Sequence, residues 1–178
     1  MNNSANGNMY AYGQQATRDL FGAYLAGNPN GVCAVVARAP LSPDAQDACE
    51  KSLHALGYGH DACVFVTLCV AEAETGANAS DAAGANDAAA ELDASALLAL
   101  VEGLDPLCII AADGEAAAAL EAAFGQPVII DAASRVVGRD VVCAASLDAL
   151  MESAQGKQAA WALFKSLPRY ATLNRKKR

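Results

Sequence analysis

The chain has 178 residues, which corresponds to one domain that can bury a hydrophobic core without disulfides or structural metals. Hydrophobic residues make up 54% of it and charged residues 18%, so the composition excludes an intrinsically disordered chain. Residues 1–152 hold all 20 acidic residues and 5 of the 12 basic ones, a net charge of −15, whereas residues 153–178 carry +7. Most of the chain is therefore expected to repel phosphate, and only its C-terminal end to attract it.

The N-terminal residues 1–15 are polar and contain no apolar segment typical of a secretory signal. No run of 18 uncharged apolar residues occurs, so we expect no membrane-spanning helix and no membrane partner. A cytoplasmic location with reduced thiols is the resulting expectation. Five cysteines lie in apolar runs, where cysteine packs as a small hydrophobic residue: Cys33, Cys63, Cys69, Cys108 and Cys143.

The first elements are predicted from turn residues and apolar runs. Residues 1–16, rich in Asn, Gly and Gln, are expected to form a flexible leader. A short helix is predicted over 17–26, because Gly27 and an Asn-Pro-Asn-Gly cluster follow it. The continuous apolar run 32–37 predicts a strand that is buried on both faces.

The next segment has a clear helix start. Ser42, Pro43 and Asp44 supply an N-cap, a proline in the first turn and an early acidic residue, which predicts a helix reaching Gly57. A second buried strand is predicted over 62–70. Residues 71–92 are mostly Ala, Gly, Asn, Asp and Glu, and we interpret them as a dispensable, low-complexity acidic insertion.

Two further helices enclose a third strand. Asp93 is a predicted N-cap for a helix over 94–104, which an Asp-Pro pair ends. The apolar run 107–112 predicts the third strand. A helix is predicted over 114–124, ending at Gly125.

The last part of the domain begins with a turn-rich stretch containing a short apolar run at 128–130. A fourth strand is predicted over 141–144, and Ser146 can cap a helical region reaching Leu167. This gives one domain over 17–168, followed by a basic tail over 169–178.

Strands that alternate with helices at these lengths predict parallel crossovers, and hence a three-layer α/β/α domain whose central parallel sheet has at least four strands. Ligands bind such sheets at the carboxyl ends of the strands. The segments in which to seek a site are therefore 37–42, 68–72, 112–115 and 144–147.

Four segments also share features with a known superfamily. Residues 32–40 (VCAVVARAP) are an apolar strand running into an Ala-Pro loop, and residues 53–67 join a Leu…Leu-Gly segment to an apolar strand ending in Thr. Residues 104–120 combine a proline, an apolar strand and an Ala-rich helix, and residues 157–165 (KQAAWALFK) carry Lys, Trp and Lys on one helix. In order and spacing, these segments resemble the uracil-DNA glycosylase superfamily over residues 32–168. The resemblance implies a four-stranded parallel sheet with the strands, numbered in sequence order, arranged 2-1-3-4.

The residues that would perform the chemistry of that superfamily are absent. Pro40 of the first loop is present, but Arg38 stands at the position of its acidic residue, and no aromatic residue follows before Leu53. Leu68 stands where an Asn would read the base, and Ala145 lies in the segment that would carry a catalytic His. Base excision needs such groups to hold the flipped base and to stabilise the leaving anion. The resemblance therefore implies a pseudoenzyme: a non-catalytic binding or structural module, with no cofactor and with an unidentified protein as its main partner.

Two other functions remain open. A divergent nucleic-acid base hydrolase could have rebuilt its site from Arg38, Ser42 and Asp44, although Asp44 is equally explained as a helix-stabilising acid. Alternatively, the basic C-terminus could bind a nucleic-acid backbone weakly and without sequence preference, or could simply be solvated. The residues of that candidate interface are Lys157, Lys165, Arg169, Arg175, Lys176, Lys177 and Arg178.

Three further patterns carry no site. His60 and Cys63 have a spacing that suits a metal, but no second pair of ligands accompanies them, so no metal is expected. Residues 57–62 (GYGHDA) match a dinucleotide fingerprint, but they follow a predicted helix and precede a strand, which is the reverse of the required context. Asp113 and Glu115 would repel an anion from the start of the helix over 114–124.

Overall fold

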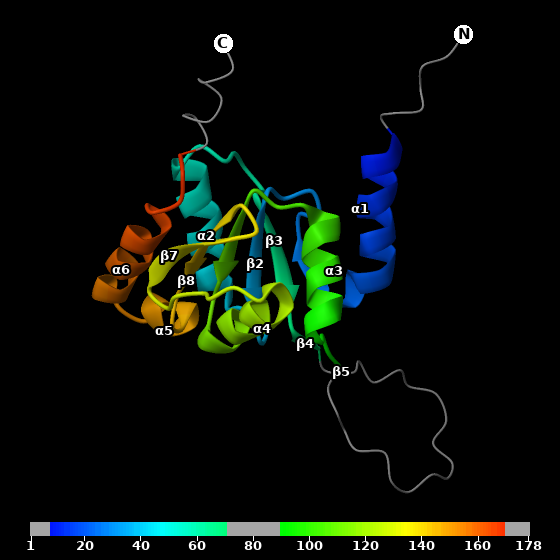
Figure 1. The fold of residues 1–178 in the computed structure, drawn as a ribbon. Coiled ribbons are helices and arrows are strands. Elements are labelled where there is room, and N and C mark those ends of the chain that lie inside the picture. Colours follow the sequence, from blue (N-terminus) through cyan, green and yellow to red (C-terminus); the bar gives the residue numbers. More distant parts are fainter. Residues whose placement is uncertain (1–7, 71–89, 170–178) are drawn as a thin grey trace, which may run out of the picture.

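The computed structural model describes residues 8–70 and 90–169 (Figure 1). The helices of this part of the chain are α1 (Asn8–Phe21), the 3-10 helix η1 (Gly22–Tyr24), α2 (Pro43–Ala55), α3 (Ala94–Leu104), α4 (Gly114–Phe124), α5 (Leu147–Met151) and α6 (Ala154–Phe164). The strands are β1 (Leu25–Gly27), β2 (Cys33–Ala37), β3 (Cys63–Thr67), β4 (Cys69–Val70), β5 (Ala90–Glu91), β6 (Cys108–Ala111), β7 (Ala132–Val136) and β8 (Arg139–Cys143). No helix in the two described ranges is long and apolar enough to cross a membrane.

A six-stranded sheet in the order β1-β3-β2-β6-β8-β7 forms the middle layer. Its four inner strands are parallel, and they follow the 2-1-3-4 order expected for the four predicted strands. The whole sheet has more strands than this predicted parallel core, because β1 and β7 add an antiparallel strand at each edge. Neither edge strand is the continuous buried run that marks an inner parallel strand, so the apolar pattern did not reveal them.

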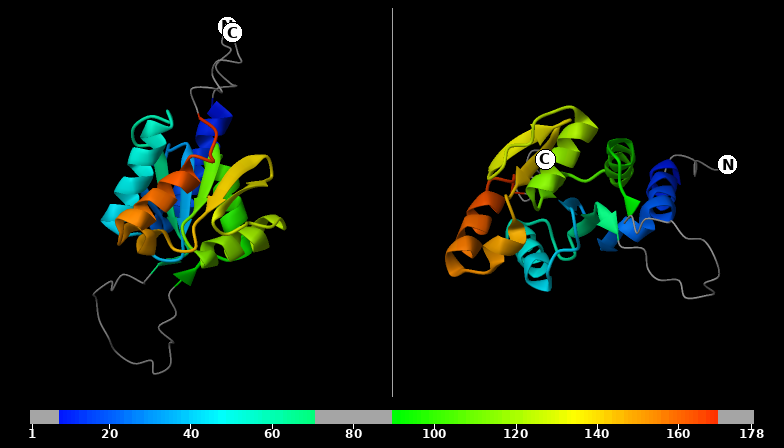
Figure 2. Two further views of the ribbon diagram at one scale, coloured as in Figure 1. Left: turned by 90° about the vertical axis from the view of Figure 1, so that its left-hand side faces the viewer. Right: turned by 90° about the horizontal axis from the view of Figure 1, so that it is seen from below.

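Helices cover both faces of the sheet, which confirms the three layers (Figure 2). Side chains alternate along β2, so that Cys33 and Val35 enter one core while Ala34 and Val36 enter the other. The first core lies beneath α2, α5 and α6, and the second beneath α1, α3 and α4. Because every residue of β2 is buried, its sequence has no polar face.

The predicted N-caps are confirmed. Ser42, Asp93, Asp113 and Ser146 each accept a hydrogen bond from the amide three residues further on, at 2.7–3.3 Å. The predicted stop of α4 is also confirmed, since Gly125 adopts a left-handed conformation with φ +64°. Local capping chemistry therefore sets these boundaries.

The N-terminal predictions are wrong in two places. The leader was expected to reach residue 16, but α1 begins at Asn8, and the helix predicted over 17–26 gives way to η1 and β1. Tertiary packing explains α1, because its buried Thr17 lies so close to Gly103 of α3 that a Cβ at Gly103 would meet Thr17 Oγ1 at 2.0 Å. Residues 1–7 lie outside the described part of the chain.

The boundaries of the acidic insertion also need correction. Residues 71–89 lie outside the described ranges, but β5 pairs with β4, and Leu92 is buried in the second core. The predicted strand 62–70 is accordingly interrupted: β3 ends at Thr67, and β4 belongs to a separate two-stranded sheet. The insertion is therefore bounded by a short hairpin rather than by loops.

The final helical region consists of two helices. Ser153 caps α6 through a 2.9 Å hydrogen bond from the Gly156 amide, which separates α6 from α5. A Cβ at Gly156 would lie 2.2 Å from the Leu150 carbonyl oxygen, so only glycine allows this close contact between the helices. The prediction of one continuous region to Leu167 missed this break, because it depends on a tertiary contact.

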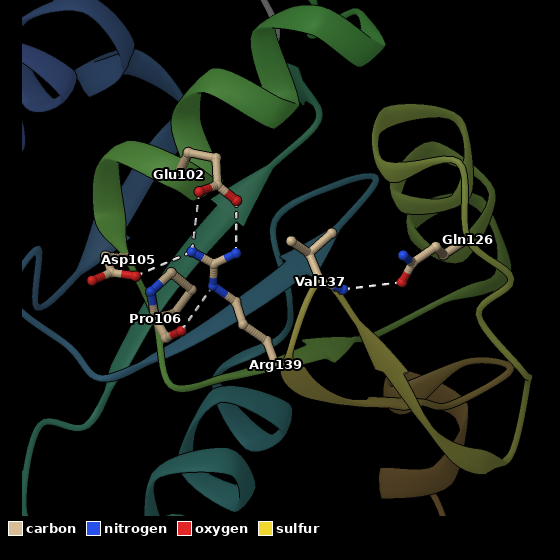
Figure 3. A network of polar contacts seen from close by, with 6 residues as sticks. All are labelled: Glu102, Asp105, Pro106, Gln126, Val137 and Arg139. Atoms are coloured by element: carbon tan, nitrogen blue, oxygen red, sulfur yellow. Dashed lines mark hydrogen bonds and ion pairs between the residues drawn. The ribbon is translucent and has the colours of Figure 1, made fainter.

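The β7–β8 hairpin is fastened to the rest of the molecule through Arg139 (Figure 3). Its guanidinium donates to both oxygens of Glu102, at 2.6 and 3.3 Å, and to Asp105 at 3.1 Å. Nε donates to the Pro106 carbonyl at 3.2 Å. Burial lowers the pKa of Arg139, but the hydrogen bonds that its guanidinium donates to Glu102 and Asp105, and their negative charges, outweigh this and raise it. Only 12% of the Arg139 side chain is exposed, so these bonds fix the hairpin at the amino end of the parallel strands.

Candidate functional site

The carboxyl ends of β2, β3, β6 and β8 meet at one edge of the sheet, as the parallel order requires. Backbone hydrogen bonds connect the segments that leave these strands: the Leu68 amide donates to Ala37 and the Ala144 amide to Ala111, both at 2.9 Å. The Leu147 amide donates to the Ala112 carbonyl at 2.7 Å. These hydrogen bonds occupy main-chain amides and carbonyls. If a cleft separated the segments, the same groups would be available to a ligand.

Arg38 lies at this edge between two carboxylates. Its Nη1 is 3.6 Å from Glu91 Oε1 and its Nε is 3.4 Å from Glu115 Oε2. Its main-chain amide donates to Asp113 Oδ2 at 2.9 Å. All three side chains of the ion pairs are about half exposed, so the pairs add little stability, but the two carboxylates oppose the attraction of Arg38 for a phosphate.

Leu68 fills the position at which the superfamily resemblance places a base-reading Asn. Its side chain is 3% exposed and belongs to the second core. The Leu92 amide donates to the Leu68 carbonyl at 2.9 Å, and the Leu92 side chain is buried in the same core. Leu68 and Leu92, which stand on either side of the acidic insertion, therefore pack together in an apolar core rather than presenting polar groups at this edge.

Pro40 and Ala145, the two other positions of the degenerate motif, are exposed on their loops. The Ala145 amide donates to Asp131 Oδ1 at 3.2 Å, so its main chain is tied to the segment before β7. Neither side chain can donate or accept a hydrogen bond. These positions supply no group for water activation or for stabilising an anion.

The alternative site of Arg38, Ser42 and Asp44 is not brought together. Ser42 Oγ donates to Asp148 Oδ1 at 2.6 Å and accepts from the Ala45 amide, so it serves as a cap held by an acidic residue. Asp44 faces a different surface, the groove between α2 and α6. A Ser-Asp pair without a base is not an activated nucleophile.

Both histidines are far from this edge along α2. His54 is in the last turn of α2 and His60 in the following loop, and their rings stack with centroids 4.0 Å apart. Cys63 is fully buried, and its amide donates to Glu50. No group of three His, Cys, Asp or Glu side chains in the described residues could hold a metal ion.

A groove between α2 and α6, about 260 Å³ in volume, contains the first Lys and the Trp of the segment 157–165. Lys157 and Trp161 of α6 line it, and Lys165 lies 5.8 Å above the Trp161 ring. Asp44 and Asp47 line it as well, and Asp47 forms an ion pair with Lys51 at 2.6 Å. Lys157 therefore shares this groove with two acidic residues and with Lys51, so the groove has mixed charges.

The remaining basic candidates are only partly described. Arg169 is exposed just after Pro168, whose carbonyl accepts a 2.6 Å hydrogen bond from Tyr58 Oη. The tail residues Arg175, Lys176, Lys177 and Arg178 lie outside the described part of the chain.

Sequence reasoning missed a second hollow, between β7 and the α5–α6 pair. It has a volume of about 530 Å³ and is lined mainly by small or aliphatic side chains: Ala132, Ala133, Leu150, Ala159, Ala162 and Leu163, with Asp131 and Ser166. No local signal in the sequence marks β7, because the strand is not a buried apolar run and Val-Gly is not one of the pairs that favour a two-residue hairpin turn.

The chain matches no protein-family model, and no curated protein matches it in sequence.

Proposed function

We propose that the chain is a non-catalytic, cytoplasmic binding module on a uracil-DNA glycosylase-like fold, with a protein as its main partner. The observation that carries the proposal is the set of side chains at the carboxyl edge: Leu68 and Leu92 are buried in the second core, and Glu91 and Glu115 pair with Arg38. A pocket for a flipped base would need space and polar groups at this place.

The fold supports the resemblance at the level of strand order. The four parallel strands follow the 2-1-3-4 arrangement that the resemblance implies, and helices cover both faces. Support for the loss of catalysis comes from the side chains at the motif positions. Leu68 is packed, Ala145 and Pro40 are non-polar, and Arg38 is paired with acids.

Nucleic-acid binding through the basic C-terminus is a second candidate, favoured by the charge of +7 over residues 153–178. The acidic residues that share a groove with Lys157 limit this function, because they repel the phosphates that Lys157 would bind. Any such binding is expected in the non-specific range, with a Kd of about 10⁻⁴ to 10⁻⁶ M at physiological salt.

The decisive experiment is a uracil-release assay on single-stranded and double-stranded DNA containing uracil, with an active uracil-DNA glycosylase as positive control. We expect release at the background rate, because removing one transition-state stabilising group costs about 100- to 1,000-fold and several such groups are absent.

The variants Asp44→Ala and Asp47→Ala form a matched pair for this assay, since both acids are exposed on α2 and only Asp44 belongs to the alternative site. Uracil release by the unmodified chain that is lost in Asp44→Ala and kept in Asp47→Ala would establish the hydrolase and overturn the proposal.

A further inference from the structure

β7 forms an open edge of the sheet. Val137 and Gly138, with φ values of +46° and +81°, make the two-residue turn of the β7–β8 hairpin. In such a hairpin the closing pair, here Val136 and Arg139, is hydrogen-bonded, and hydrogen bonding then alternates along the strand. The peptide groups of Ala133 and Arg135 therefore point away from β8, and β7 is the last strand on this side of the sheet in residues 8–70 and 90–169.

This edge lacks the features that normally prevent strand addition. Proteins protect open edges with proline, a bulge or an outward lysine. β7 contains no proline, its five residues pair with β8 without a bulge, and the guanidinium of Arg135 turns back to the Gly138 carbonyl at 3.1–3.3 Å. The edge is therefore accessible for pairing with another strand.

Apolar side chains flank β7 at both of its ends. Ile129 and Ile130, just before the strand, are 55% and 50% exposed, and Val137, just after it, is 53% exposed. Val137 also holds a positive φ that a β-branched residue rarely adopts, and the Gln126 side chain fixes it by accepting from its amide at 3.0 Å (Figure 3). The turn therefore holds an exposed apolar side chain in place at the end of β7.

We infer that the β7 edge binds the β7 edge of a second copy of this chain, in an antiparallel pair around a two-fold axis. Ala133 then lies opposite the partner's Arg135, and the outward peptide groups of both strands form hydrogen bonds across the axis. The two sheets become one continuous sheet. This inference is independent of the proposed function.

Three features favour a second copy over an unrelated strand. In an antiparallel pair of β7 strands, the end with Ile129 and Ile130 of one copy lies beside the Val137 end of the other. Each copy therefore covers the exposed apolar side chains of the other copy. The same arrangement sets the end that carries Asp131 against the end that carries the partner's Arg135, which are opposite charges. The hollow beside β7, lined by Ala133, Ala159 and Ala162, leaves room on the same face for the partner's side chains.

The experiment measures the mass of the full chain by sedimentation velocity at about 1–200 μM protein. We expect a concentration-dependent dimer. Ala133→Lys places a lysine opposite the partner's Arg135, and this like-charge pair should weaken the dimer at least about tenfold. Adding Arg135→Glu to Ala133→Lys should restore it, because the facing pair becomes Lys-Glu.

Ala118→Lys is the matched control, since Ala118 is an exposed alanine of α4, on the other face of the sheet. Thermal unfolding verifies that every variant is folded. A chain that stays monomeric throughout the range, equal effects of the lysine at 133 and at 118, or no rescue in the double variant would each overturn the inference.

Discussion

Cysteine side chains fill the centre of the core beneath α2. Cys33 pairs in register with both Cys63 and Cys108 on the neighbouring strands, and Cys49 of α2 belongs to the same core. Cys69 is the exception among the six, since it is half-buried on β4 rather than packed in an inner strand. Because a thiolate reacts and a buried thiol resists ionisation, these core cysteines act as small hydrophobic residues.

The raised pKa values of these thiols predict a loss of stability at alkaline pH. Burial, followed by the charges of Glu50 and Asp148, raises the pKa of Cys49 from 9.0 to about 12, and burial with nearby acids raises that of Cys143 to about 11. The folded state therefore keeps these protons while the unfolded state releases them above pH 9.0. The free energy of unfolding should be unaffected by these groups below that pH and fall by about 1.4 kcal/mol per pH unit for each thiol above it.

Urea unfolding at pH 8, 9, 10 and 11 under reducing conditions measures this slope. Cys49→Ala and Cys143→Ala should each have a shallower decline above pH 9 than the unmodified chain, whatever their stability at pH 8. Identical slopes in all three proteins would contradict the assignment of the decline to these thiols.

At the scale of elements, β4 and β5 form a two-residue ladder that closes the acidic insertion, with Val70 paired to Ala90. Glu91, which pairs with Arg38 at the carboxyl edge, is the last residue of this ladder, and Leu92, which is buried in the second core, follows it directly. The 19 residues 71–89 therefore connect two positions that the fold holds next to each other. The ladder, rather than the length of the insertion, positions Leu92 above Leu68.

Replacing residues 71–89 with a two-residue Asn-Gly turn should preserve the fold and raise the free energy of unfolding by about 1–2 kcal/mol, because a shorter loop costs less entropy to close. Chemical denaturation measures the change, and a variant with the same 19 residues in scrambled order should unfold like the original chain. Loss of cooperative unfolding in the shortened variant, with the scrambled one intact, would show that the insertion itself supports the core.

The predictable elements are those whose signals are local. Fully apolar runs identified β2, β3, β6 and β8, and side chains such as Asp93 marked the helix starts. The edge strands β1 and β7 and the break before α6 could not be predicted in this way, because they depend on pairing with β3 and β8 and on the contact of Gly156 with Leu150.

The same distinction applies to the candidate site. The resemblance predicted that Arg38, Leu68 and Ala145 stand at positions of reactive groups, since each prediction concerns the residue at a single position. It did not reveal what occupies the edge, because Glu91 and Leu92 come from beyond the insertion and Glu115 from α4. Only the three-dimensional structure brings these residues together.

At the scale of the whole molecule, three surfaces differ in character. The carboxyl edge carries Glu91 and Glu115 beside Arg38, the α2–α6 groove has mixed charges, and the β7 edge has no partner strand among the described residues. The net charge also differs along the chain, with −15 on residues 1–152 and +7 on residues 153–178. We propose that this protein binds its partners through surfaces away from the carboxyl edge. Enzymes with this type of sheet bind their ligands at that edge.

The most direct measurement of this claim follows the amide chemical shifts of the isotopically labelled full chain during titration with a single-stranded DNA that contains uracil. We predict that the amides of Arg38, Leu68 and Ala145 do not shift, and that any changes are confined to the basic residues from Lys157 onward and decrease with added salt. Saturable, salt-resistant shifts at Arg38, Leu68 and Ala145 would show that the carboxyl edge binds a base, and would contradict the account.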